Sequence, residues 1–382
     1  MKIVIAPDSF KESMTALEAA ESMKKGWKDI FGEEASVDVI PMADGGEGTT
    51  TSLSEALEAS MHQIEVTSPN GEKVTAEYAV SKDGRTAVLE MAEASGIGLV
   101  DEQERNPLTA TSYGTGELIQ DALGKGVEKI IIGIGGSATN DGGAGMIQAL
   151  GGRLLDNENQ EVAAGGAALA GLHSIHLSGL DDRLKQVSIS VACDVKNPLT
   201  GENGASAVYG PQKGATPDMV KTLDEALGVF ADVMKRDLNA DIAHIEGAGA
   251  AGGMGAGLIG CLGASLESGI DIVLKETNFY ERVKGADLVV TGEGKMDSQT
   301  VYGKTPVGVA KAAHSVNKNA VVLAVCGQLG EGYEAVYEHG ITAAFSMVPG
   351  PHDLQTALKN GPEYAEKISR SLALMWKASS GK

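Results

Sequence analysis

Apolar positions at the start of the chain follow two spacings in succession. Lys2 to Ala6 forms a short apolar run, which ends at Pro7. Beyond this break, apolar residues recur every three or four positions: Met14, Leu17, Ala20, Met23, Trp27 and Ile30. The short run is typical of a buried strand, and the longer spacing is typical of an amphipathic helix. Thr15 and Glu18 form a capping-box pair ahead of that helix. The pattern therefore predicts a strand, a loop and a helix.

The same alternation of strand and helix follows at once and returns near the end of the chain. A second strand is expected at 37–40, with a helix through Leu53 and Leu57. Later strands are expected at 286–291, 320–325 and 341–345, and helices after Pro306, near Val336 and from Leu354 to Trp376. Alternating strands and helices predict a doubly wound, Rossmann-like sheet of five or more parallel strands. In such a sheet, ligands bind at the carboxyl ends of the strands.

The middle of the chain has a different pattern, which indicates a second fold unit. Segments 63–67, 74–80 and 85–89 alternate or run as strands, and a turn at Asp83 and Gly84 marks a hairpin. Strands are also expected at 129–134 and 187–191, and helices after Thr115 and Asp141. We interpret 61–285 as a mixed α/β domain inserted into a discontinuous domain of residues 1–60 and 286–382. Two connections between domains predict a hinge, and hence an active site in the interdomain cleft that closes against water.

Composition narrows the class of ligand. The chain has 382 residues, more than one hydrophobic core usually serves, and its formal net charge is −21. This charge argues against nucleic acid or an anionic membrane as partner, because both are bound mainly through Lys and Arg. Three cysteines outside any C-x-x-C spacing give no support for disulfides or zinc. The sequence lacks a signal-peptide core and an apolar run of about 20 residues, so we expect a cytoplasmic protein without a membrane span.

A glycine-rich loop is the strongest local motif. The sequence IIIGIGGSATNDGGAG runs from Ile130, so that a strand leads into glycines and small hydroxyl residues and then into a helix. Free backbone amides in such a loop can surround a phosphate. The predicted phosphate-binding residues are Gly135, Gly136, Ser137, Thr139 and Asn140. Asp141 could hold Mg²⁺. The alternative is a tight strand-to-helix turn in which Asn140 or Asp141 caps the helix.

Polar loops also follow three strands of the discontinuous domain. The first, PDSFKES, offers Asp8, Ser9 and Lys11 as a clamp for a carboxylate or a phosphate. The second carries Asp44 and Glu47, and the third carries Glu293, Lys295 and Asp297. Some of these acids are expected only to cap helices, because Asp and Glu favour first turns.

Two further segments carry candidate residues with open alternatives. Lys304 lies in SQTVYGKT, which misses the P-loop pattern because Ser298 replaces its first glycine. Lys304 is then either an anion contact or a solvated lysine at a helix start. Asp194, in CDVKNPL after a strand, is the preferred proton-accepting base, and an Asx-turn is its alternative role.

The run GAGAAGGMGAG from Gly247 contains a G-x-G-x-x-G spacing, the weak basis for a rival dehydrogenase function. The segment before it is a poor strand, so close helix packing or nucleotide backbone contact is favoured over NAD binding. A second rival is a non-catalytic two-domain binding protein. From the residues alone, the prediction is a small-anion kinase or an enzyme with a nucleotide-binding cleft.

Seven motifs in one order resemble a known family over nearly the full length. They are PDSFK, P-ADGGEGT, TSYGTGE, GGSATNDGG, CDV-NP-L, GAGAAGG and TGEG-D-QT. Together they resemble the glycerate kinases of bacterial glyoxylate and glucarate catabolism. The resemblance implies ATP- and Mg²⁺-dependent phosphorylation of D-glycerate by direct in-line transfer. The 2-hydroxyl is the favoured acceptor, and 3-phosphoglycerate is the alternative product.

The resemblance extends to site residues, partners and assembly. It suggests that Asp8, Ser9, Lys11, Arg105 and Ser112 seat or act on glycerate. The glycine loop, Lys295 and Lys304 would bind ATP, and Asp141 and Glu293 would hold Mg²⁺. Small molecules are the expected partners, and the protein is expected to be a monomer or a homodimer.

Overall fold

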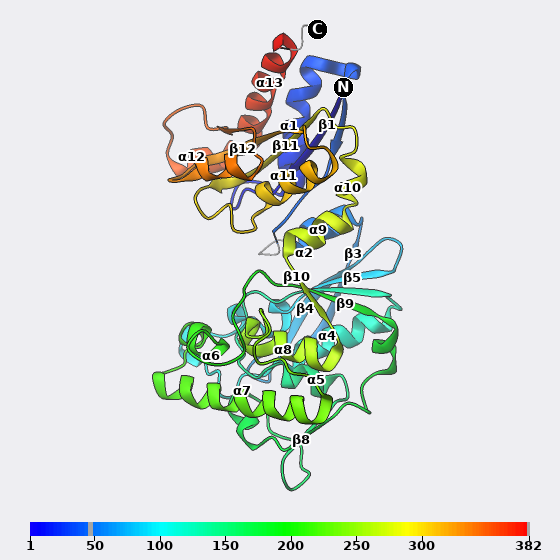
Figure 1. Cartoon of the computed structure of the whole chain (residues 1–382), viewed down its shortest axis with the longest axis vertical. Coiled ribbons are helices and arrows are strands. Elements are labelled where there is room, and N and C mark those ends of the chain that lie inside the picture. Colours follow the sequence, from blue (N-terminus) through cyan, green and yellow to red (C-terminus); the bar gives the residue numbers. More distant parts are fainter. Residues whose placement is uncertain (45–48, 380–382) are drawn as a thin grey trace. The chain divides into compact units, whose positions relative to one another are not determined.

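The computed structural model describes residues 1–44 and 49–379, so Glu47 lies outside the described residues (Figure 1). The chain forms two compact units. The first contains Met1–Glu58 and Ser268–Lys382, and the second contains Ala59–Glu267. Each unit has its own sheet and its own hydrophobic core. The location of the active site between domains stays a prediction.

The first unit is built on a five-stranded parallel sheet, as predicted. Its strands are β1 (Lys2–Pro7), β2 (Ser36–Val39), β11 (Leu288–Met296), β12 (Val321–Leu329) and β13 (Ala343–Ser346). Their order across the sheet is β13-β12-β11-β1-β2. The chain proceeds from β1 toward one edge and, from β11, toward the other. The direction therefore reverses between β1 and β11, and the crevice above such a switch point is where doubly wound sheets bind ligands.

Helices cover this sheet. They are α1 (Ala16–Phe31), α2 (Thr49–Ala56), α9 (Gly269–Glu276), α10 (Phe279–Arg282), α11 (Thr305–Val316), α12 (Leu354–Lys359) and α13 (Gly361–Ser379). The capping box that begins α1 is confirmed: Thr15 Oγ1 accepts from Glu18 N–H at 3.2 Å, and Thr15 N–H donates to Glu18 Oε2 at 2.9 Å. Gly26 lets α1 lie directly against α13, since a Cβ there would lie 2.3 Å from the carbonyl oxygen of Glu366.

Several predicted boundaries differ from the structure. Strands β11 and β12 extend to Met296 and Leu329, beyond the expected ends at 291 and 325. The helix expected from Leu354 to Trp376 is two helices, separated at Asn360. Pro362 explains the break, because proline lacks the N–H that would continue the first helix and is suited to the first turn of the second. The inserted segment ends at Glu267 instead of at 285. Residues 268–285 join the first unit because α9 and α10 pack against α11. The packing is close: a Cβ on Gly308 of α11 would lie 2.3 Å from the side chain of Ile270 in α9.

The second unit contains a mixed six-stranded sheet, which confirms the predicted α/β class. Its order is β10 (Ser265–Glu267), β9 (Ser188–Ala192), β6 (Lys129–Gly133), β5 (Thr86–Glu90), β4 (Lys73–Val80) and β3 (Ser60–Thr67). The predicted hairpin is present, since β3, β4 and β5 pair antiparallel. The remaining neighbours pair parallel. A separate antiparallel pair consists of β7 (Arg153–Leu155) and β8 (Ser174–His176).

The helices of the second unit surround this sheet and its loops. They are α3 (Ala92–Ser95), α4 (Tyr113–Gly124), α5 (Ala144–Ala149), α6 (Ala205–Tyr209), α7 (Pro217–Leu238) and α8 (Ala250–Leu262). Among the residues that the structure describes, none of the helices is long and apolar enough to cross a bilayer. The three cysteines are free thiols.

Candidate active site

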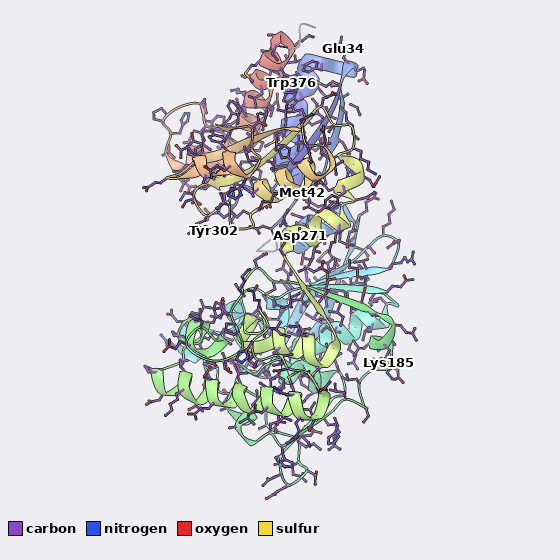
Figure 2. All side chains as sticks on the ribbon, in the orientation of Figure 1. Glu34, Met42, Lys185, Asp271, Tyr302 and Trp376 are labelled. Carbon is purple, nitrogen blue, oxygen red and sulfur yellow. The ribbon has the colours of Figure 1, made fainter. Side chains whose placement is uncertain are left out.

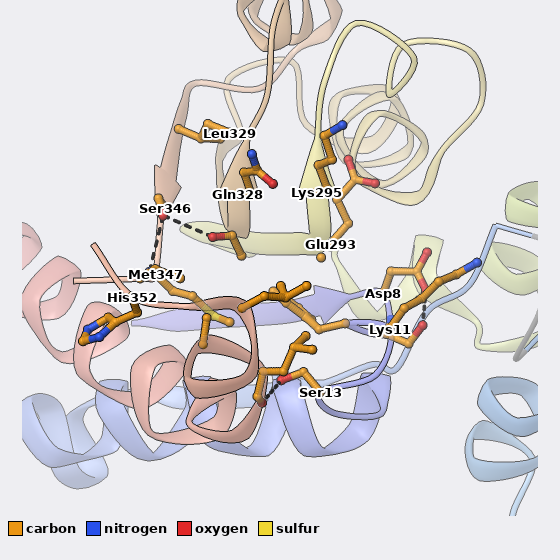
Figure 3. A pocket seen from close by; sticks show the side chains of 18 of the residues that line it. Asp8, Lys11, Ser13, Glu293, Lys295, Gln328, Leu329, Ser346, Met347 and His352 are labelled. Atoms are coloured by element: carbon orange, nitrogen blue, oxygen red, sulfur yellow. Dashed lines mark hydrogen bonds between the residues drawn. The ribbon is translucent and has the colours of Figure 1, made fainter. Parts of the chain in front are cut away.

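A cavity of about 830 Å³ opens at the carboxyl ends of β1, β11 and β12 in the first unit (Figure 3). Its charged lining consists of residues that the sequence singled out: Asp8, Lys11, Asp44, Glu293, Lys295 and Lys304. Ser9 also lines it. The parallel strands bring these side chains together from segments almost 300 positions apart, at the switch point where the strand order reverses.

Asp8 directly follows β1 and is held by three donors. Its Oδ1 accepts from the Ser9 N–H at 2.6 Å and from the Ser9 hydroxyl at 3.3 Å. Its Oδ2 accepts from the hydroxyl of Thr305, at the start of α11, at 2.5 Å. Burial raises the pKa of Asp8 to about 6; the Thr305 hydrogen bond opposes this shift, and the charge of Asp44 adds to it.

Glu293 lies within β11 and is almost wholly buried. Its Oε1 accepts from the hydroxyl of Thr300 at 2.7 Å. Burial raises the pKa of Glu293 to about 7, and nearby Asp8 contributes in the same direction, whereas Lys304 opposes the shift. Two neighbouring carboxyl groups of the cavity therefore take up protons near neutral pH.

Lysines neutralise part of this negative charge. Lys304 Nζ lies 3.8 Å from Glu293 Oε2 and 3.9 Å from Asp297 Oδ1, and its side chain is about two-thirds buried. Lys295 Nζ lies 3.2 Å from Asp297 Oδ2. Lys304 thus lines the cavity from the N-cap position of α11, and its contact with an anion stays a prediction. Such cations can bind a phosphate or carboxylate, and buried carboxylates can accept a proton or hold a divalent cation.

The sequence reasoning missed the opposite end of the cavity. That end is lined by the last residues of β12 and β13, by the segment after β13 and by α12: Gln328, Leu329, Ser346, Met347, Val348, His352, Leu354, Ala357 and Leu358. Figure 3 shows Met347 and His352 at the far end from Asp8 and Lys11. These residues lie at or after the carboxyl ends of strands, and this position was the one sequence signal for them. Most of them are uncharged, so they did not stand out as candidates for binding an anion.

The predicted glycine loop lies in the second unit, after β6. Only Gly135 and Gly136 of its predicted ligand-binding residues are exposed. Ser137, Thr139 and Asn140 are buried, and the Asn140 amide donates to the Ser206 hydroxyl at 3.0 Å. The loop side chains therefore point into the protein.

Asp141 and Ser112 hold that loop in place. Asp141 is fully buried, and its Oδ2 accepts from the Ser112 N–H at 2.9 Å and hydroxyl at 2.8 Å. The N–H groups of Gly143 and Gly145 also donate to its carboxylate. This is the capping role that the sequence left as the alternative. The structure gives no support to Asp141 as a metal ligand or to Ser112 as a substrate contact.

Lys213 is a second residue that the sequence reasoning missed. Its Nζ donates to the Ser137 hydroxyl at 2.5 Å and to the Thr139 carbonyl oxygen at 2.6 Å. Complete burial lowers the pKa of Lys213 to about 7, while Asp141 acts in the opposite direction. A single lysine before a glycine is not a recognisable sequence motif. The contact of Lys213 with the glycine loop could therefore be found only from the fold.

Arg105 and Asp194 also belong to the second unit. Arg105 is partly buried, and its Nε has no hydrogen-bond partner within the described parts of the chain. Gly214, next to Lys213, lies against the Arg105 backbone, since a Cβ there would be 2.6 Å from the Arg105 carbonyl oxygen. Asp194 is exposed beyond the end of β9. Their predicted roles stay predictions.

The GAGAAGG run packs against neighbouring backbone. A Cβ on Gly249 would lie 2.1 Å from the Pro198 carbonyl oxygen, and one on Gly252 would lie 2.0 Å from that of Thr139. These contacts favour the close-packing interpretation. A dinucleotide-binding G-x-G-x-x-G motif follows directly on a strand, and the segment before this run is not a strand. The structure therefore does not support dinucleotide binding by this run. Across residues 1–44 and 49–379, no group of three or more His, Cys, Asp or Glu side chains is arranged to hold a metal.

Comparison with known proteins agrees with the motifs. The sequence model of the "Glycerate kinase family" matches residues 3–377. The chain is 54% identical to the glycerate kinase of Halalkalibacterium halodurans, over 98% of this chain and 97% of that protein. It is 49% identical to the glycerate 2-kinase of Escherichia coli K12, with the same coverage. The crystal structure of a putative glycerate kinase 2 from Salmonella typhimurium LT2 superposes with a TM-score of 0.91, at 49% identity and 100% coverage of both chains.

Proposed function

Because this chain belongs to the glycerate kinase family, we propose that it transfers the γ-phosphoryl group of ATP to the 2-hydroxyl of D-glycerate. Its full-length relatives support kinase activity on glycerate. The choice of the 2-hydroxyl is supported by the glycerate 2-kinase among those relatives. 3-Phosphoglycerate remains the alternative product.

The observation that carries the mechanism is the charged cavity at the switch point. Phosphoryl transfer needs cations around the moving group and little covalent chemistry from the protein. Lys11, Lys295 and Lys304 line one cavity with Asp8 and Glu293. We propose that the lysines neutralise the negative charge on the oxygens of the transferred phosphoryl group. The transfer is then a direct in-line displacement, since no nucleophilic intermediate is required of these residues.

Asp8 and Glu293 are the residues that fit Mg²⁺. Magnesium in kinases is usually bound by one or two carboxylates together with substrate phosphates, so a larger cluster is not needed. Burial is the main cause of the raised pKa of Glu293, and the negative charge of Asp8 adds to it. A divalent cation bound between the two carboxylates would offset that repulsion. Bound there, Mg²⁺ would neutralise charge on the phosphate oxygens. Glu293 was already a predicted Mg²⁺ ligand from the sequence. Asp8 takes the place of Asp141, the other predicted ligand.

Two carboxylates are candidates for the proton acceptor. Asp194 remains the choice from the sequence, and its exposed position at a strand end is compatible with contact to substrate. Asp8 is the alternative, because its raised pKa lies near the range at which a general base works best. Arg105, with its buried unpartnered Nε, is our candidate for the glycerate carboxylate. Gly135 and Gly136 remain candidates for backbone contact to a phosphate.

A coupled ADP-release assay with Mg-ATP and D-glycerate tests the proposal, with lactate and glyoxylate as controls. Phosphorus NMR of the product distinguishes 2- from 3-phosphoglycerate. Transfer from ATP with an isotopically chiral γ-phosphoryl group should invert configuration at phosphorus if displacement is direct. Absence of glycerate-dependent ADP release by folded protein would refute the function, and retention of configuration would refute direct transfer.

A further inference from the structure

The cavity of the first unit is larger than a three-carbon acid needs. Its volume of about 830 Å³ is in the range of pockets that bind drug-sized ligands. The carboxylates Asp8 and Glu293 lie away from Met347 and His352, and Lys295 lies beside Gln328 (Figure 3). A glycerate molecule beside the carboxylates would leave the other end empty.

The other end has the chemistry of a site for a flat heteroaromatic group. Leu329, Met347 and Val348 line it from the sheet side, and Ala357 and Leu358 line it from α12. Polar groups are few: the exposed Gln328 amide, the His352 imidazole and the hydroxyl of Ser346, which donates to the Gly327 carbonyl oxygen at 3.2 Å. Apolar walls with a small number of oriented polar groups are typical of cofactor and nucleobase pockets.

Between the two ends, the lining includes bare backbone. Gly294 of β11 and Gly327 of β12 both line the cavity. They lie against each other, since a Cβ on Gly327 would be 2.6 Å from the Gly294 carbonyl oxygen. The absence of side chains at both positions lets a ligand approach the strand ends closely. Lys295 follows Gly294 directly, so a cation stands beside this stretch.

We propose that this apolar end binds the purine nucleoside of ATP, with the triphosphate running over Gly294 and Gly327 to the lysines. The inference rests on the proposed function and adds to it the location of the nucleoside. The γ-phosphate then reaches the end of the cavity that holds Asp8, Glu293 and Lys304. Base selectivity comes from Gln328, Ser346 and His352, the polar groups beside the apolar walls.

Filling the apolar end tests this assignment. Ala357→Trp places a large side chain on α12 in the cavity lining, and Ala378→Trp makes the same change on the exposed surface of α13. We expect Ala357→Trp to raise the KM for ATP and the Kd for ADP by about tenfold or more, with the KM for glycerate unchanged at saturating ATP. The Ala378→Trp control should leave all three unchanged. Val348→Trp, which fills the cavity from the sheet side, serves if Ala357→Trp does not fold.

Photolabelling of the unaltered protein with 8-azido-ATP provides a second readout. The label is expected on peptides covering 328–358, and excess ADP should prevent it. Labelling confined to peptides of 59–267, or a filled cavity that raises the KM for glycerate alone, would overturn the assignment. Calorimetric titration with ADP measures nucleoside binding without turnover. A protein that binds ADP at this cavity but does not phosphorylate glycerate would therefore refute the proposed function and keep the nucleoside site.

Discussion

Asp8 and Glu293 hold protons closer to neutral pH than ordinary carboxyl groups do. Burial raises their pKa values to about 6 and about 7. Both must be ionised to hold a divalent cation, and Asp8 must be ionised to accept a proton. We therefore expect kcat/KM to fall as pH decreases from about 7 to about 5, since kcat/KM reports groups of the free enzyme. Initial rates at subsaturating ATP measure this, with stability checked at each pH. A flat profile over this range would show that neither group is required in its ionised form.

The choice between the two candidate bases is a separate prediction. Asparagine keeps the shape of aspartate and removes its ability to accept the hydroxyl proton. The variant that removes the base should lose about 10²- to 10⁴-fold in kcat with little change in the KM for glycerate. Comparing Asp194→Asn with Asp8→Asn by steady-state kinetics over a range of Mg²⁺ concentrations identifies it, because a loss that excess Mg²⁺ restores belongs to Asp8 as a metal ligand and not as the base. Equal and small losses in both variants would exclude general-base catalysis by either residue.

Lys213 links the stability of the second unit to pH. Its pKa in the folded chain is about 7, below the ordinary value of 10.5, because it is completely buried. Between these values the unfolded chain binds a proton that the folded chain does not, so stability rises with pH from about 7 to about 10. The contribution is on the order of a few kcal/mol.

Lys213→Met should remove that rise. Urea unfolding of wild type and variant at about pH 7 and pH 9 measures the difference in slope. Lys185→Met is the matched control, since Lys185 is exposed on the second unit (Figure 2). Parallel pH dependence in wild type and Lys213→Met would contradict the lowered pKa of Lys213.

At the level of elements, close contact between backbones holds the glycine loop to α8. A Cβ on Gly252 would meet the Thr139 carbonyl oxygen at 2.0 Å, and Gly252 has a φ of +67°. Gly252→Ala is expected to destabilise the protein by more than about 2 kcal/mol. Gly228, inside α7, has open space around it, so Gly228→Ala should stabilise by about 0.5–1 kcal/mol. Thermal unfolding of both variants measures these changes in stability, which should have opposite signs. A neutral Gly252→Ala would show that the loop and α8 can separate without cost.

Elements with a clear period could be predicted from the sequence, and contacts between distant segments could not. The five strands of the first sheet and the hairpin of the second were expected because apolar runs and turn residues are local signals. The polar end of the cavity was expected because Asp8 and Glu293 follow apolar runs at 2–6 and 286–291, although β11 extends through Glu293 to Met296. Lys213 and the apolar end were missed, since their roles depend on which buried surfaces the fold brings against them. For the GAGAAGG run, close helix packing or nucleotide backbone contact was the favoured interpretation, and the contacts of Gly249 and Gly252 favour packing.

At the scale of the whole molecule, the second unit is continuous in sequence and the first is not. Residues 59–267 contain all six strands of their sheet and their own core. We expect a fragment of residues 59–267 to fold cooperatively alone, whereas a fragment of 1–58 should not fold, because β1 lacks its neighbour β11. Circular dichroism and thermal unfolding of the two fragments test this. A disordered 59–267 fragment would show that the second unit depends on the first.

The position of β1 in the middle of its sheet has a consequence for synthesis. β1 lies between β2 and β11, and β11 begins only at Leu288. At about 5–20 residues per second, a ribosome takes roughly 15 to 60 seconds to reach β11 after making β1. During this interval the nascent second unit can complete its sheet, while β1 still lacks its neighbour β11 and α1 still lacks its neighbour α13. Asp8 is thus among the first residues to be made and among the last to reach its place in the site.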